Sequence, residues 1–190
     1  MSLLLERIKT ETDIFKKHLL FSVWITNKLK ERKCNLPIIV GGSAVEIYAS
    51  PFYVSGDIDF VFQNRKEFED ILFSTGLFKK LGKNYISDEL GIFIEIVDDE
   101  LNGSYSKIKE ITIEIEGKEY TINVIGVEDL IIDRLNACVH WKSESDCELA
   151  QILLEGYKEE LDLDYLYKRA KEELVENKLK NIMKELEDEG

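Results

Sequence analysis

The sequence contains little proline, cysteine or positive charge, and each shortage excludes a class of protein. Only Pro37 and Pro51 are prolines among 190 residues, and no stretch rich in proline, glycine or serine marks a linker between domains. Aliphatic and aromatic residues are spread along the chain, which argues against disorder. A content of 44% hydrophobic and 33% charged residues predicts one packed domain beneath a charged surface.

The three cysteines, Cys34, Cys138 and Cys147, lack the C-x-x-C spacing typical of zinc sites. We therefore expect neither zinc nor a disulfide framework, and we expect a reducing, cytoplasmic location. No apolar run approaches the ~18 residues of a membrane span. The first residues also lack the apolar segment of a signal peptide.

Positive charge is scarce, because 25 Lys and Arg residues face 38 Asp and Glu residues, for a net charge of -13. Such a chain repels phosphates at long range, which disfavours tight binding to a long nucleic acid. The charge instead favours a small nucleotide that arrives with Mg²⁺.

Hydrophobic periodicity predicts helices at both ends of the chain and strands in the middle. The expected helices cover 3–32, 44–49, 65–74, 127–141, a segment that Ser145 caps and Gly156 closes, and a long final segment that Asp162 or Asp164 caps. The expected strands cover 38–40, 57–62, 84–87, 91–97, 111–115 and 120–124, and the last four form two hairpins. This order predicts an α+β fold with a mixed sheet of about five or six strands flanked by helices. We expect a single domain, with an N-terminal helix at 1–35, a sheet core at 36–126 and a helical tail at 127–190.

The residues with the clearest chemical meaning lie in two short segments. The expected strand 38–40 runs into Gly41-Gly42-Ser43, where glycines allow the backbone to approach a phosphate and a helix start offers free N–H groups. Asp57 and Asp59 alternate on the next expected strand, so their carboxylates share one face. A divalent metal would relieve their repulsion. Together these parts favour phosphoryl or nucleotidyl transfer.

Gly42-Ser43, a gap of thirteen residues and Asp57-Ile58-Asp59 resemble the signature of the DNA-polymerase-β-like nucleotidyltransferase superfamily. The resemblance implies a third carboxylate on a neighbouring strand, and Glu95, a lone charge within the apolar run 92–97, is the candidate. The segments 127–135 and 145–146 resemble the helical part of small prokaryotic nucleotidyltransferases related to abortive-infection toxins. That second resemblance implies a basic residue facing the nucleotide, and Arg134 matches it better than Lys142 does.

The resemblance also implies a mechanism. Asp57, Asp59 and Glu95 would hold two Mg²⁺ ions, and Gly42, Ser43 and Arg134 would bind the nucleoside triphosphate. Attack at the α-phosphorus would transfer a nucleoside monophosphate, for example from ATP, to a hydroxyl of a protein or small molecule.

Other interpretations of the same residues stay open. Gly41-Gly42 can be an ordinary turn, Glu95 a solvent-facing strand residue and Arg134 a partner of surface acids. Arg134 and His140 form an R-x5-H pattern similar to that of HEPN ribonucleases, although those are all-helical. His18 is expected at the surface. At the level of function, the alternatives are a nucleotide-binding module with weak or no catalysis, and a toxin–antitoxin or defence component that acts through a protein partner.

Overall fold

A computed structural model describes residues 3–188 and shows the expected α+β architecture. Within these residues the chain forms eight α-helices, one short 3-10 helix and a seven-stranded mixed sheet. The helices are α1 (Leu3–Thr10), α2 (Ile14–Glu31), α3 (Gly41–Ala49), α4 (Arg65–Ser74), α5 (Val127–His140), α6 (Glu144–Tyr157), α7 (Leu163–Glu172) and α8 (Glu176–Asp188), with the 3-10 helix η1 at Tyr105–Lys107. The strands are β1 (Ile38–Val40), β2 (Ile58–Val61), β3 (Lys79–Leu81), β4 (Asn84–Ser87), β5 (Ile92–Asp98), β6 (Lys109–Ile115) and β7 (Lys118–Val124).

The sheet has the order β3-β4-β5-β2-β1-β7-β6, which places the two short strands β1 and β2 at its centre. Strand β2 runs antiparallel to β1 and parallel to β5, and β1 runs parallel to β7. The first residues of the central strands are buried apolar residues, which anchor the strands in the core. Because Val40 pairs with Asp59, the end of β1 and the start of β2, which carry the polar residues identified in the sequence, lie side by side.

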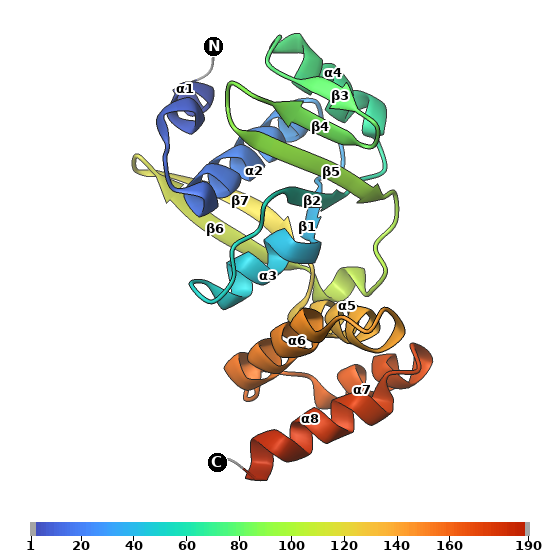
Figure 1. The fold of residues 1–190 in the computed structure, drawn as a ribbon. Coiled ribbons are helices and arrows are strands. Elements are labelled where there is room, and N and C mark those ends of the chain that lie inside the picture. Colours follow the sequence, from blue (N-terminus) through green and yellow to red (C-terminus); the bar gives the residue numbers. More distant parts are fainter. Residues whose placement is uncertain (1–2, 189–190) are drawn as a thin grey trace.

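The helices divide into two groups at opposite ends of the molecule (Figure 1). Helices α2 and α4 contact one another beside the sheet, and Phe68 of α4 packs its ring 5.7 Å from that of Phe60 on β2. Helices α5 to α8 pack together as a separate layer. Helix α3 contacts β1 and β2 as well as α5 and α6, so it joins the sheet to the helical layer.

The expected single helix at 3–32 is wrong, because the chain breaks it between α1 and α2. The side chain of Glu11 accepts hydrogen bonds from the backbone N–H groups of Thr12 and Asp13, at 2.9 and 3.0 Å. Asp13 then caps α2 by accepting the N–H of Lys16 at 3.0 Å. Acidic side chains that accept hydrogen bonds from the local backbone compete with the hydrogen bonds of a continuing helix. At Glu11 and Asp13 these side-chain bonds replace the helical ones, and the helix is interrupted.

The expected long final helix is also divided, into α7 and α8. Leu174 lies between them with a φ of 62°, and the N–H of Val175 donates to the carbonyl of Ala170 at 2.8 Å. This left-handed residue ends α7 without a glycine, so the sequence carried no stop signal there. Asp162 caps α7, as one of the two predicted alternatives.

Two further expectations about the last third of the chain are corrected. Ser143 rather than Ser145 caps α6, by accepting the N–H of Asp146. The structure also joins Cys138 of α5 to Cys147 of α6 in a disulfide, which the spacing rules did not predict. The two cysteines are adjacent because the turn at 141–143 folds α6 back onto α5.

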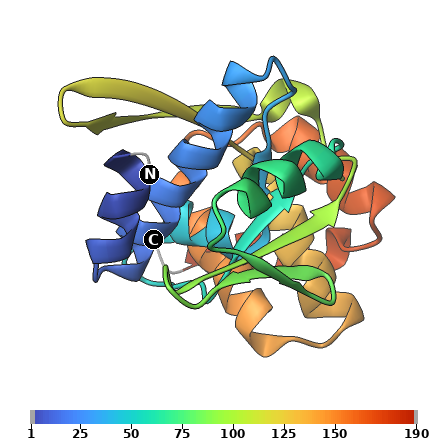
Figure 2. The same ribbon diagram turned by 90° about the horizontal axis from the view of Figure 1, so that it is seen from above.

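The predicted hairpins are confirmed as β4–β5 and β6–β7, and strand β3 is an addition to the prediction. Glu116 and Gly117 connect β6 to β7 with φ values of 53° and 74°, the pair of positive angles that a tight two-residue hairpin turn requires. Figure 2 shows this hairpin extending beyond the rest of the sheet, with α1 and α2 nearby.

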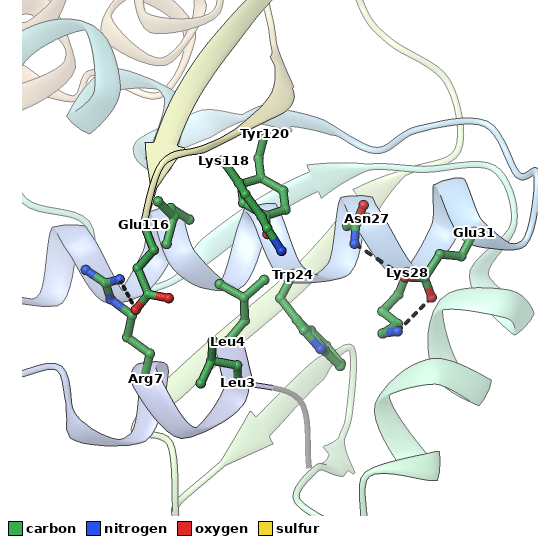
Figure 3. A pocket seen from close by; sticks show the side chains of 11 residues that line it. Leu3, Leu4, Arg7, Trp24, Asn27, Lys28, Glu31, Glu116, Lys118 and Tyr120 are labelled. Carbon is green, nitrogen blue, oxygen red and sulfur yellow. Dashed lines mark hydrogen bonds and ion pairs between the residues drawn. The ribbon is translucent and has the colours of Figure 1, made fainter.

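A pocket of about 260 Å³ lies where α1, α2 and the β6–β7 hairpin meet (Figure 3). Arg7 of α1 pairs with Glu116 of the turn at 3.2 Å, while Trp24 of α2 is buried in the pocket wall. These contacts attach the hairpin to the N-terminal helices, on the part of the sheet away from the predicted site. Among the described residues, no helix has the length and apolar character that crossing a bilayer demands.

Candidate active site

The predicted glycine–serine turn lies at the junction of β1 and α3. Gly41 begins the helix with a φ of +58°, a conformation that favours glycine. Ser43 does not face solvent: its hydroxyl donates to the carbonyl of Val40 and accepts the N–H of Asp59, both at 3.1 Å. Ser43 therefore holds the turn against β2, in addition to any role toward a ligand.

Asp59 contacts this turn directly. Its Oδ2 atom accepts the backbone N–H of Gly42 at 3.1 Å. A Cβ atom on Gly41 would lie 2.4 Å from the same oxygen, so only glycine allows the carboxylate to come so close. The glycine–serine turn at 41–43 and the segment that contains Asp57 and Asp59 are therefore packed against one another.

The three predicted carboxylates, Asp57, Asp59 and Glu95, lie on or next to the adjacent strands β2 and β5. Asp57 lies in the bend just before β2, and its carboxylate lies 3.4 Å from the hydroxyl of Ser55. Asp59 and Glu95 are directly paired in the parallel register of β2 and β5, so they share one face of the sheet. The alternate residue Phe60 points to the other face, against α4.

Burial raises the pKa of Asp59 to about 6. This raised pKa already includes the negative charges of Asp57 and Glu95, which act in the same direction as burial, and the Gly42 N–H and the charge of Arg134, which oppose the shift. Clustered carboxylates that resist ionisation are stabilised by a nearby cation.

The donor chemistry of this site fits Mg²⁺, which prefers oxygen ligands and is commonly bound by one or two carboxylates together with substrate phosphates. Asp57 and Asp59 supply such carboxylates. Within residues 3–188 no group of three or more His, Cys, Asp or Glu side chains is already arranged as a metal cage.

Asp57 and Asp59 open onto a cleft of about 700 Å³ between the sheet and the helical layer. Its sheet side includes Gly41, Gly42 and the end of β5, and its helical side includes Arg134 on α5. Neither Glu95 nor the buried Ser43 is among the lining residues. The structure thus brings Glu95 beside Asp59 without placing it on the cleft surface, and its catalytic role stays a prediction.

Arg134 is the one arginine in the cleft wall, and within residues 3–188 no lysine lines the cleft. Its guanidinium pairs with Asp146 at 2.7 Å and with the adjacent Asp133. Although burial opposes the charge, Asp133 and Asp146 hold the pKa of Arg134 above its usual range. The Nε atom of Arg134 is buried and has no hydrogen-bond partner among the described residues. Lys142 is exposed and does not line the cleft.

Several lining residues were not among the site residues predicted from the sequence, although His140 had been noted in the R-x5-H pattern with Arg134. Tyr53 and Ser55 come from the loop before β2, and His140 and Trp141 come from the end of α5. Ser55 lies two residues before Asp57, and nothing in the sequence signalled that Tyr53 or Trp141 would line the cleft. Their position depends on how the helical layer packs against the sheet.

A buried pair lies behind the glycine–serine turn. The Nδ1 atom of His18 on α2 lies 3.4 Å from Oε2 of Glu46 on α3, and both side chains are buried. The expected surface position of His18 is therefore wrong. Burial lowers the pKa of His18 to about 4 and raises the pKa of Glu46, so the pair avoids isolated buried charges.

The fold is that of nucleotidyltransferase-like proteins. One similar solved structure is an antigenic nucleotidyltransferase-like protein from Paracoccidioides brasiliensis, with a TM-score of 0.56, 15% identity, and coverage of 91% of this chain and 93% of that one. Another is the antibiotic-resistance factor ANT(2'')-Ia, with a TM-score of 0.53, 16% identity, and coverage of 93% and 98%.

These likenesses extend over nearly the whole chain, and at such low identity they show the fold alone. No protein-family model matches the sequence, and no curated protein matches it significantly. The likeness confirms the predicted nucleotidyltransferase fold. The likeness does not show whether the chain belongs to the toxin-related subgroup of nucleotidyltransferases.

Proposed function

We propose that this chain is a Mg²⁺-dependent nucleotidyltransferase that moves a nucleoside monophosphate from a triphosphate such as ATP to a hydroxyl acceptor. The observation that carries the proposal is the contact of Asp59 with the Gly41-Gly42 turn, beside Asp57 and on the floor of the cleft. A phosphate-binding turn and paired carboxylates are the parts that nucleotidyl transfer needs.

Each residue has a specific role in this proposal. The start of α3 at Gly41 and Gly42 gives a triphosphate close access to the backbone, and Arg134 faces it from the helical wall. Asp57 and Asp59 would hold the metal ions, which neutralise the charge that develops on the phosphates. Ser43 keeps the turn and β2 in register by its two hydrogen bonds.

A second candidate is a nucleotide-binding module with weak or no turnover. It is favoured by the position of Glu95, which pairs with Asp59 in register but does not line the cleft. Membership of a toxin–antitoxin or defence pair is a third proposal, which co-purification of a partner from the native host would support.

Calorimetric binding of the four nucleoside triphosphates, with and without Mg²⁺, tests the proposal. Wild type is compared with Asp57→Ala/Asp59→Ala and with the control Asp70→Ala/Asp164→Ala, which removes two exposed carboxylates outside the cleft. We expect binding that requires Mg²⁺ and is lost only in the first variant. Binding that persists in that variant, or no binding to wild type, would refute the proposed site.

Pyrophosphate release separates the two leading candidates. A transferase releases pyrophosphate in the presence of an acceptor, and Asp59→Asn abolishes this release while circular dichroism shows the fold intact. Tight Mg²⁺-dependent binding with no release, even with cell extract as a source of acceptors, would favour the binding module.

A further inference from the structure

The hydrogen-bond donors at the glycine–serine turn are largely engaged by the protein itself. The Gly42 N–H donates to the Asp59 carboxylate, and the Ser43 hydroxyl donates to a backbone carbonyl, both at 3.1 Å. The Ser55 hydroxyl lies against the same turn and donates to the carbonyl of Asp57 at 2.9 Å. A triphosphate bound at this turn therefore needs a further donor.

Positive charge in the cleft supplies little of what is missing. Arg134 is the one arginine in the described part of the wall, and no lysine from residues 3–188 lines it. Asp133 and Asp146 already pair with its guanidinium. A hydrogen bond from a neutral group to an ionised phosphate oxygen is stronger than one between two neutral groups. A neutral side chain at the turn can therefore contribute substantially to phosphate binding.

Tyr53 places such a donor against the first turn of α3. It belongs to the loop between α3 and β2, where Phe52 and Val54 are 77% and 61% exposed. Tyr53 itself is half-buried, packs against the hydrophobic core and lines the cleft. A Cβ atom on Gly42 would lie 3.0 Å from the hydroxyl oxygen of Tyr53, so this hydroxyl lies directly beside the turn.

The described protein does not use the hydroxyl of Tyr53. Five tyrosine hydroxyls form hydrogen bonds within residues 3–188, and that of Tyr53 is not among them. Burial raises the pKa of Tyr53 despite the opposing charge of Arg134, so the hydroxyl keeps its proton at neutral pH. The hydroxyl is thus a donor that opens onto the cleft without a protein acceptor.

We infer that the Tyr53 hydroxyl donates a hydrogen bond to a phosphate oxygen of a nucleoside triphosphate at the start of α3. This inference rests on the proposed function, and it adds to the site a residue outside the glycine–serine and Asp57–Asp59 motifs. The packed ring holds the hydroxyl in place before the nucleotide arrives, which lowers the entropic cost of the contact.

Tyr53→Phe tests the contact, because it removes the hydroxyl and keeps the ring. In calorimetry with Mg²⁺ and a non-hydrolysable ATP analogue, we expect the Kd of the variant to be about tenfold higher than that of wild type, since a hydrogen bond to a charged group is lost. A contact with phosphate does not depend on the base. The Kd should therefore rise by the same factor for each nucleoside triphosphate that binds wild type.

Tyr167→Phe is the matched control. Tyr167 lies on α7 outside the cleft, and its hydroxyl also lacks a hydrogen-bond partner among the described residues. This variant should bind nucleotide as wild type does. The melting temperature of ligand-free Tyr53→Phe should match that of wild type, because the lost hydroxyl bonds to no described protein group. A tyrosine with a purely structural role would lower it.

An unchanged Kd in Tyr53→Phe, an equal rise in Tyr167→Phe, a rise confined to one base, or a lower melting temperature of ligand-free Tyr53→Phe would overturn the inference. If binding requires Mg²⁺ and the Asp57–Asp59 pair but not the Tyr53 hydroxyl, only this inference fails. If wild type shows no Mg²⁺-dependent nucleotide binding, the proposed function is refuted, and this inference with it.

Discussion

Asp59 is held in a position that lowers the stability of the protein when no metal is present. Burial and the charge of Asp57 raise its pKa to about 6, so at neutral pH the ionised carboxylate is destabilising. Functional sites commonly contain groups that a ligand, rather than the fold, stabilises. The carboxylate is nevertheless fixed by the N–H of Gly42.

Asp59→Asn should therefore stabilise the metal-free protein at pH 7.5 by up to roughly 3 kcal/mol, because the variant removes a charge whose pKa is raised. The same change should abolish the rise in melting temperature caused by Mg²⁺ and ATP. Thermal unfolding with and without both ligands measures the two effects. Asp70→Asn, an exposed change on α4, should alter neither, and loss of metal-free stability in Asp59→Asn would contradict the argument.

Gly41 and Gly76 form a matched pair for testing whether the close contact between Gly41 and the Asp59 carboxylate matters. Both have positive φ values, but a Cβ on Gly41 would lie 2.4 Å from Asp59, whereas nothing lies within 4 Å of one on Gly76. Gly76→Ala should cost about 1 kcal/mol through backbone strain alone. Gly41→Ala should cost clearly more in denaturant unfolding and should eliminate nucleotide binding. Equal losses of stability would show that the contact with Asp59 is unimportant.

At the scale of elements, the contact between α2 and α3 depends on the neutral state of His18. Its pKa is lowered to about 4 by burial, with Lys17 acting in the same direction and Asp57 in the opposite one. Below pH 6.5 the unfolded chain takes up a proton that the folded chain does not bind. The free energy of unfolding should therefore fall as the pH falls from 6.5 to 4, by up to roughly 3 kcal/mol from this residue.

Urea unfolding of wild type and of His18→Gln across this pH range isolates the effect. Glu46 has a raised pKa, so its contribution to the free energy of unfolding falls as the pH rises above the usual pKa of glutamate. This contribution has the opposite sign to that of His18, and Glu46 is present in both proteins. His140→Gln, which removes the other histidine from an exposed position, should parallel wild type. If His18→Gln also parallels wild type, His18 is not kept neutral by burial.

The elements themselves were largely predictable from local sequence. Buried runs such as 38–40, alternation in 111–115 and the Glu116-Gly117 turn all predict the observed strands. The breaks at Asp13 and Leu174 were not predicted, because a competing side-chain hydrogen bond and a non-glycine left-handed residue give weak sequence signals. Strand β3 was missed because its three residues are all exposed, so it has no apolar periodicity.

The site was predictable where its residues are close in sequence, and less so where they meet only in the fold. The turn and Asp59 were found because a short motif contains both. Trp141 follows α5 and Glu100 follows β5, so these two residues meet at the cleft only in the fold, which no local pattern encodes. The disulfide between Cys138 and Cys147 was missed for the same reason, since it depends on α6 folding back along α5.

At the scale of the whole molecule, Asp129 connects the helical layer to the sheet side of the cleft. This buried residue of α5 accepts the N–H of Ser104 at 2.8 Å and the hydroxyl of Tyr165 at 2.7 Å. Arg169 of α7 lies 3.4 Å from the same carboxylate and also bonds Asn102, at 3.1 Å. Three segments that form or support the cleft therefore meet at one carboxylate.

Asp129→Ala should lower the free energy of unfolding by about 2–5 kcal/mol, because it leaves two partly buried donors, the Ser104 N–H and the Tyr165 hydroxyl, without their acceptor and removes one of the three acidic partners of Arg169. Glu172→Gln is the matched control, since it removes an exposed partner of the same arginine and should cost less than about 1 kcal/mol. Where Asp129→Ala still folds, hydrogen exchange should increase in 99–107 and in α7 while β1 and β2 stay protected. A small loss of stability, or exchange that increases uniformly along the chain, would mean that the cleft walls are held together by apolar packing and not by this carboxylate.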